Sequence, residues 1–112
     1  MDDERARELL RAERLRTEER LNDVLGQGQG DRTGAAEQGE MFDPAQSLDQ
    51  EEVDQAVAAE LRSHLAAIDR AELRLAAGTF GRSVRSGLAI PDDRLEADPS
   101  AELTVEEAAD GL

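Results

Sequence analysis

The side chains that could do chemistry in this sequence are few. There is no cysteine and a single histidine, His64. Disulfides, thiolate chemistry and cysteine-ligated metals are therefore excluded, and one imidazole cannot by itself hold a zinc ion. No P-loop and no Ser/His/Asp arrangement is present, and the GQGQG run at 26–30 lacks the strand and the spacing of a dinucleotide site. We expect no enzymatic activity and no cofactor.

Acidic residues dominate the composition. The 112 residues include 27 Asp and Glu against 13 basic residues, all of them Arg, and the net charge is −14. This charge repels phosphates, so we expect a basic protein partner and no sequence-specific binding of nucleic acid, although an acidic mimic of DNA is conceivable. No apolar run is long enough to span a membrane, and the N-terminus lacks secretory character. We therefore expect a cytoplasmic protein.

Two amphipathic segments predict an all-α helical hairpin over residues 1–77. Helices are expected at 3–25 and 48–77, since each carries apolar residues at helical spacing. The five glycines of 26–39 predict a flexible linker, and 40–47 would complete the tip of the hairpin. Ser47 and Gln50 match a capping box for the second helix, and Arg14 interrupts the apolar stripe of the first. The predicted stripes are Ala6, Leu10, Thr17, Leu21, Val24 and Leu25 in the first helix, and Val53, Val57, Leu61, His64, Ile68, Ala71 and Leu75 in the second.

His64 lies on the inner stripe of the second predicted helix. A histidine at such a position is expected to pack in the seam between the helices. A hairpin whose stability depends on pH is the alternative.

Residues 78–112 differ in character and predict a small lobe. Pro91 suits the first position of a short helical turn, and Thr104 with Glu107 is a second capping-box match that opens a last helix. Leu, Ile, Val and Phe together number only 23 in the chain, so the core of the lobe must be small. Its predicted members are Phe80, Val84, Leu88, Ile90, Leu95, Leu103 and Val105.

The segment 78–108 resembles the DksA/TraR family of bacterial transcription factors over about 30 residues without a gap. The family run is close to G-T-Y-G-x-C-x-x-C-G-x-x-I-P-x-x-R-L-E-A-x-P-x-A-x-x-C-x-x-C. The matching residues are Gly78, Thr79, Phe80, Gly81, Gly87, Ile90, Pro91, Arg94, Leu95, Glu96, Ala97, Pro99 and Ala101. The resemblance implies a coiled-coil hairpin that carries a zinc-finger-like lobe.

All four zinc cysteines of the family are replaced. They fall on Ser83, Ser86, Thr104 and Glu107, with 17 residues between the two pairs. Hydroxyls are poor zinc ligands, and one carboxylate cannot hold a tetrahedral ion, so we predict a lobe without structural zinc. Arg82 and Arg85 flank two of these positions and form a small basic patch, which could meet an acidic surface or be ordinary solvated cations.

The resemblance also places the D-x-x-D-x-A tip motif of the family on residues 40–45. Asp43 and Ala45 match it, and Glu40 replaces an aspartate. The family's tip enters the secondary channel of RNA polymerase close to the catalytic magnesium. The resemblance therefore implies a monomeric regulator whose hairpin tip modulates initiation, with a contribution of guanosine tetraphosphate whose residues cannot be placed. The alternatives are an acidic adaptor that kept the scaffold but binds another basic protein, in which case Glu40 and Asp43 read as solvated acids, and a paralogue with little function.

Overall fold

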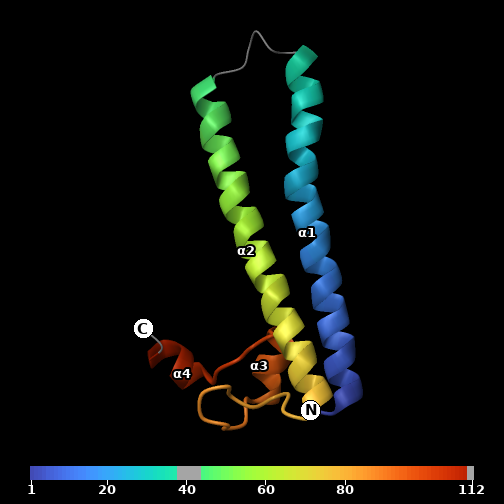
Figure 1. Ribbon diagram of the computed structural model, residues 1–112, viewed down its shortest axis with the longest axis vertical. Coiled ribbons are helices and arrows are strands. Elements are labelled where there is room, and N and C mark those ends of the chain that lie inside the picture. Colours follow the sequence, from blue (N-terminus) through green and yellow to red (C-terminus); the bar gives the residue numbers. More distant parts are fainter. Residues whose placement is uncertain (38–43, 111–112) are drawn as a thin grey trace.

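Two long helices form an antiparallel hairpin, and two short ones belong to a lobe at one end of it (Figure 1). This computed structural model describes the backbone of residues 1–37 and 44–110, and the side chains of 1–26 and 50–110. The helices are α1 (Asp3–Glu37), α2 (Pro44–Ala77), α3 (Asp92–Ala97) and α4 (Val105–Asp110). The molecule measures 57 × 31 × 20 Å. The predicted all-α hairpin with a small lobe is confirmed.

The first helix begins as predicted but ends later. The backbone N–H of Arg5 donates to Asp2 Oδ1 at 2.7 Å, so Asp2 caps α1. The predicted end of the helix near Gly26, with a flexible linker at 26–39, is wrong because α1 continues to Glu37. Each glycine costs about 1 kcal/mol in a helix, but unlike proline it keeps the N–H that the backbone ladder needs. A helix that is already nucleated can therefore propagate through it.

The second helix begins earlier than predicted. It starts at Pro44, so the expected start at 48 and the tip at 40–47 are wrong in their bounds. Proline suits the first turn because its fixed φ matches the helix and the first turn needs no N–H donor. Ser47 therefore lies within α2 and does not cap it. The predicted end at Ala77 is confirmed, and Gly78 follows with φ +80°.

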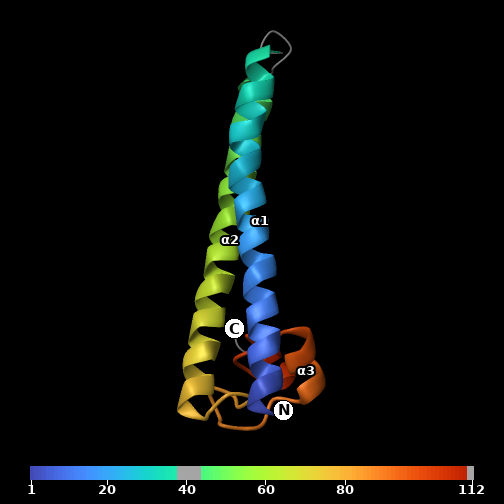
Figure 2. The same cartoon turned by 90° about the vertical axis from the view of Figure 1, so that its right-hand side faces the viewer.

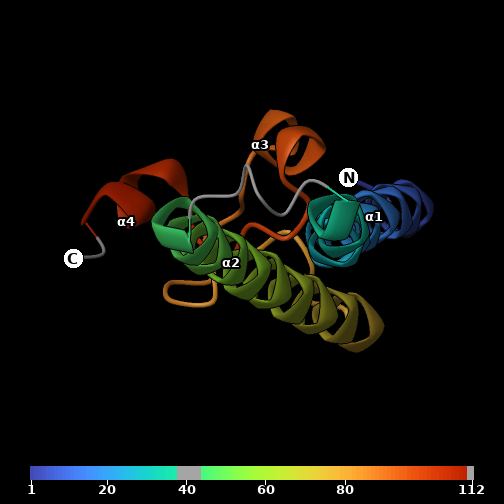
Figure 3. The ribbon, with the colours of Figure 1, turned by 90° about the horizontal axis from the view of Figure 1, so that it is seen from above.

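The hairpin is packed through small residues. Figure 1 shows α1 and α2 side by side along the long axis, and Figure 2 shows α3 beside the base of α1. Seen from above in Figure 3, α4 and α1 lie on opposite sides of the molecule. Ala6, Leu10 and Thr17 of α1 are buried, as are Ala58, Ile68 and Ala71 of α2. The predicted stripes are confirmed near the lobe. They fail toward the other end, where Leu25, Val53 and Val57 are exposed and Ala58 takes the buried position.

An ion pair between the two long helices explains why Arg14 interrupts the apolar stripe of α1. Its guanidinium binds the carboxylates of Asp69 and Glu72 on α2 and stays at the edge of the seam.

Over its described residues, neither long helix has a stretch apolar enough to cross a membrane.

The lobe is built from tight turns around a very small core. Ile90, Leu95 and Ala101 are its buried apolar cluster, and Phe80 packs both on this cluster and on that of the hairpin. The short helix after Pro91 is confirmed as α3. The placement of three expected core residues is wrong, because Val84, Leu88 and Val105 are 57%, 62% and 56% exposed. Pro99, Ser83, Ser100 and Thr104 are buried instead, as a lobe closed by turns has little interior volume.

Candidate functional site

The residues of the predicted tip lie mainly outside the described part of the chain. Glu40 and Asp43 fall in 38–43, and Ala45 lies in the first turn of α2 without a described side chain. The elements that flank them are placed: α1 ends and α2 begins at the end of the hairpin away from the lobe (Figure 1). The ends of α1 and α2 that flank the predicted tip therefore lie at the opposite end of the hairpin from the lobe.

The turn 81–90 orders the first two former zinc-ligand positions. Gly81 O accepts from Ile90 N at 2.8 Å and Ser83 N donates to Leu88 O at 2.8 Å, with Gly87 in the left-handed region at φ +77°. Ser83 Oγ accepts the backbone N–H groups of Arg85 and Ser86 at 3.1 and 3.2 Å. The turn thus presents Ser83 and Ser86 side by side, as local hydroxyl-to-backbone bonds do.

The other two positions form the predicted capping box at the start of α4. Thr104 N donates to Glu107 Oε1 at 3.0 Å, and Glu107 N donates to Thr104 Oγ1 at 3.2 Å. Hydrogen bonding from the side chain of Ser83, from the backbone of Thr104 and from the side chain of Ser86 lowers the pKa of Glu107 to about 2. The structure therefore brings all four positions together around one carboxylate, and we call this set the Glu107 cluster.

The Glu107 cluster does not fit a zinc ion. Its donors are three hydroxyls and one carboxylate, and these groups are already engaged in hydrogen bonds with one another or with the backbone. Structural zinc is held by thiolate, imidazole and carboxylate groups in a set of four. Within the described ranges, no group of three or more His, Cys, Asp or Glu residues could hold a metal. Without a metal, the turn is linked to the segment of α4 by Val84 N, which donates to Glu102 O at 2.9 Å, and by Arg85 Nη1, which donates to Glu107 O at 3.5 Å.

Ion pairs hold the lobe against the hairpin. Arg5 on α1 binds Glu96 on α3 through Nε at 2.9 Å and Nη2 at 2.7 Å. Arg70 on α2 binds Glu102 through the same two atoms at 3.0 and 2.9 Å, and Arg74 Nη1 approaches Glu102 at 3.4 Å. These bidentate pairs fix direction as well as distance. Sequence analysis missed these pairs, since a charged residue at a single position carries no signal of a partner 28 to 91 residues away.

Glu102 is the carboxylate of the lobe that binds two arginines of α2. Hydrogen bonding from Arg70 lowers its pKa, burial opposes the effect, and the charges of Arg70 and Arg74 add to it. A carboxyl whose pKa is lower in the folded state stabilises the fold above its unfolded pKa, and this contribution is lost as the pH falls through the folded value.

We expect Glu102→Gln to lower the free energy of unfolding by about 1 kcal/mol at pH 7, a value that allows for solvent screening of Arg70. The difference from wild type should shrink as the pH falls below the ordinary range of a glutamate carboxyl and through the lowered pKa of Glu102, where the wild-type carboxyl itself becomes protonated. Urea unfolding at pH 7 and pH 3 measures both values. Glu52→Gln on α2 is the matched control, and a pH-independent loss would contradict the assignment.

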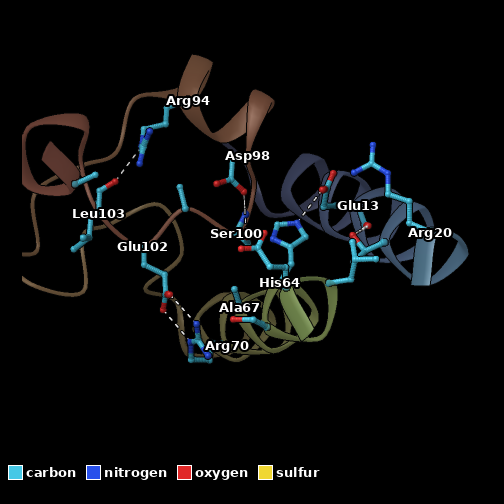
Figure 4. A pocket seen from close by; sticks show the side chains of 16 residues that line it. Glu13, Arg20, His64, Ala67, Arg70, Arg94, Asp98, Ser100, Glu102 and Leu103 are labelled. Atoms are coloured by element: carbon cyan, nitrogen blue, oxygen red, sulfur yellow. Dashed lines mark hydrogen bonds and ion pairs between the residues drawn. The ribbon is translucent and has the colours of Figure 1, made fainter. Parts of the chain in front are cut away.

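A cleft of about 660 Å³ lies between the hairpin and the lobe (Figure 4). His64 Nε2 and Glu13 Oε1 are 2.9 Å apart on its hairpin side, which confirms that His64 packs in the seam. Burial opposes ionisation of Glu13, but hydrogen bonds from Arg16 and His64 outweigh it, so the pKa of Glu13 lies below its usual range. On the lobe side, Arg94 donates to the Leu103 carbonyl at 3.0 Å. Among the groups that line the cleft, Glu13 thus pairs with His64, and Glu102 pairs with Arg70.

The hairpin and the lobe define a class of protein in which an α-helical rod carries a compact globular end. The structure of the transcription factor DksA2 from Pseudomonas aeruginosa is similar to this chain, with a TM-score of 0.68 and 25% sequence identity. The match covers 97% of this chain and 81% of that one. The resemblance to the DksA/TraR family is thereby confirmed for a chain without cysteine, which has a DksA-like fold. No family model matches the sequence, and no curated protein matches it.

Proposed function

We propose that this chain is a bacterial transcription regulator that binds RNA polymerase without catalysing a reaction. The observation that carries the proposal is the match to a transcription factor over 97% of the chain, hairpin and lobe together. The hairpin would enter the secondary channel of the polymerase and carry Glu40 and Asp43 toward its magnesium. Carboxylates at the end of a rod are attracted by a metal ion and by basic side chains.

The mechanism would be a shift between states of the polymerase. A rod that occupies the channel changes initiation only through its different affinity for different polymerase complexes. The lobe would set the depth and angle of insertion, because the Arg5–Glu96 and Arg70–Glu102 pairs fix it to the base of the rod. The protein would act as a cytoplasmic monomer, and its lobe would fold without zinc.

Binding of the full-length protein to RNA polymerase of its host tests this proposal. A known secondary-channel factor should compete with it. The variant Glu40→Ala/Asp43→Asn should still bind, but its effect on transcription should fall by about tenfold or more. Asp2→Asn/Asp3→Asn at the far end of the rod is a charge-matched control. Absence of binding at protein concentrations of roughly tens of micromolar would overturn the proposal.

An acidic adaptor for a different basic protein is the second candidate. The net charge of −14 and the replacement of an aspartate by Glu40 at the tip favour it. Such an adaptor would use the faces of the helices, so it would bind its partner unchanged after the tip substitutions. It would also fail to compete with a secondary-channel factor.

A further inference from the structure

The backbone passes from the hairpin to the lobe through one short segment. The hydrogen bonds that close α2 end at Thr79, whose N–H donates to a carbonyl in the last turn of that helix at 2.9 Å. Those of the lobe begin at Gly81, whose carbonyl accepts from Ile90 N at 2.8 Å. Phe80 lies between them, and Gly81 has φ +85°. A short connection of this kind, between two separately hydrogen-bonded parts, is where a hinge is placed in proteins.

The side-chain hydrogen bonds that join the lobe to the hairpin in the described part of the chain are ion pairs. Arg5 binds Glu96, and Glu102 binds Arg70 and Arg74. No backbone hydrogen bond among the described residues joins the two parts. The side chains stay exposed, by 47% and 43% in the pair of α1 and by 53% and 28% in that of Arg70. Salt therefore reaches these pairs and weakens their attraction.

Apolar packing between the lobe and the hairpin is narrow. The two parts have separate apolar clusters, and Phe80 is the partly buried residue that packs on both. Beyond it, hairpin and lobe face each other across the cleft of about 660 Å³ (Figure 4). The lobe is held together by bonds of its own, such as that from Val84 N to Glu102 O and those of the Glu107 cluster. It therefore keeps its own core when its position on the hairpin changes.

We propose that the lobe swings as a rigid body on residues 79–81, and that the pairs Arg5–Glu96 and Arg70–Glu102 are a latch that opens as the ionic strength rises. With the latch closed, the lobe has one fixed direction relative to the rod. With the latch open, the lobe stays folded but takes many directions. Local opening of this kind needs few apolar contacts and exposed polar links, and the junction has both. The inference concerns the free protein and does not depend on the proposed function.

The hairpin itself should not respond to ionic strength in this way. Leu10, Ile68 and Ala71 are buried where α1 and α2 pack, and burial of apolar surface does not depend on the attraction of charges. The same signal therefore acts differently on the two parts of the molecule, since it loosens the lobe and leaves the rod in place.

Distances between spin labels in the full chain test the latch. The chain has no cysteine, so Glu19→Cys/Ala97→Cys places one label on α1 and one on α3. At about 0.05 M sodium chloride these labels should give one main distance. At about 1 M a second and longer distance should grow by roughly fivefold. Glu19→Cys/Arg62→Cys places both labels on the hairpin and should keep one distance throughout.

A variant without the latch carboxylates separates their role from a general effect of salt. In the labelled chain, Glu96→Gln/Glu102→Gln should show the longer distance already at low salt. Its population should be about tenfold that of the unmodified latch and nearly independent of salt. Asp93→Asn/Glu106→Gln is the matched control, because it removes two lobe acids that form no ion pair with the described part of the hairpin. This control should behave like wild type.

Three results would overturn the latch. The first is a single unchanged distance at both salt concentrations and in the variant without the carboxylates. The second is a salt response that persists in full after both carboxylates are removed. The third is a change of distance in the hairpin control together with a loss of helical circular dichroism, because hairpin and lobe would then unfold together. Constant helicity with a longer distance confined to the lobe label is the result expected.

Discussion

The variant Ser83→Cys/Ser86→Cys/Thr104→Cys/Glu107→Cys is expected to bind one zinc ion, although wild type offers no ligand set for it. The reason is geometric, since the turn 81–90 and the start of α4 already bring these four side chains together around Glu107. Four thiolates with two-residue spacing in each pair are a standard structural zinc set. The apparent binding free energy should be about 10 kcal/mol at neutral pH.

Without zinc, the same variant should be less stable than wild type. It lacks the Thr104 and Glu107 side chains that cap α4, and the side chain of Ser83 no longer accepts the amides of Arg85 and Ser86 as a hydroxyl. Melting curves with zinc and with a chelator measure both effects, and the d–d absorption of bound cobalt reports whether four thiolates surround the ion. The melting temperature of wild type should not respond to either addition.

The double variant Ser83→Cys/Ser86→Cys is the control. It supplies two thiolates and leaves the Glu107 cap intact, so it should bind zinc far more weakly than the quadruple variant. Failure of the quadruple variant to take up zinc in a one-to-one ratio would show that the four side chains do not converge. The hydrogen-bonded cluster would then be no replacement for a metal site.

The elements that sequence analysis predicted well are those with a local cause. The start of the first helix at residue 3, the capping box of Thr104 with Glu107, and the helix after Pro91 depend on residues within four positions, and the structure confirms each. The end of α1 was placed wrongly because glycine content is a weak signal against a helix that is already propagating. Local caps are therefore predicted more reliably than the full extent of a long helix, since the start of α2 was also misplaced.

Long-range features were harder to predict from the sequence. The apolar spacing of α2 does not distinguish Val57 from Ala58 as the buried residue, since the choice depends on where α1 approaches. Exposure of Val84, Leu88 and Val105 depends on how the turn 81–90 closes, which follows from hydrogen bonds to residues up to 18 positions away. The positions of the Glu107 cluster came from a family resemblance, and the bonds within it required the structure.

Phe80→Ala should be the most damaging single substitution in the described lobe. Phe80 is the apolar residue that packs on both clusters, with Leu10, Ile68 and Ala71 on the hairpin side and Ile90 and Leu95 on the lobe side. Removing a large, partly buried aromatic ring leaves a void between the two clusters. The free energy of unfolding should fall by about 3 kcal/mol, the lower end of the range for such substitutions, because the ring is only partly buried.

The consequences should be confined to the attachment of the lobe. With the ring gone, the pairs Arg5–Glu96 and Arg70–Glu102 become the main links between lobe and hairpin, and exposed pairs weaken at high salt. Amide exchange should therefore quicken at 81–104 more than in α2, and more so at about 1 M salt than at low salt. Leu73→Ala, at a position 71% exposed, should change stability by less than about 0.5 kcal/mol. An equal loss of amide protection in the hairpin and in the lobe would contradict this expectation. It would mean that hairpin and lobe unfold as one cooperative unit whether or not Phe80 joins their cores.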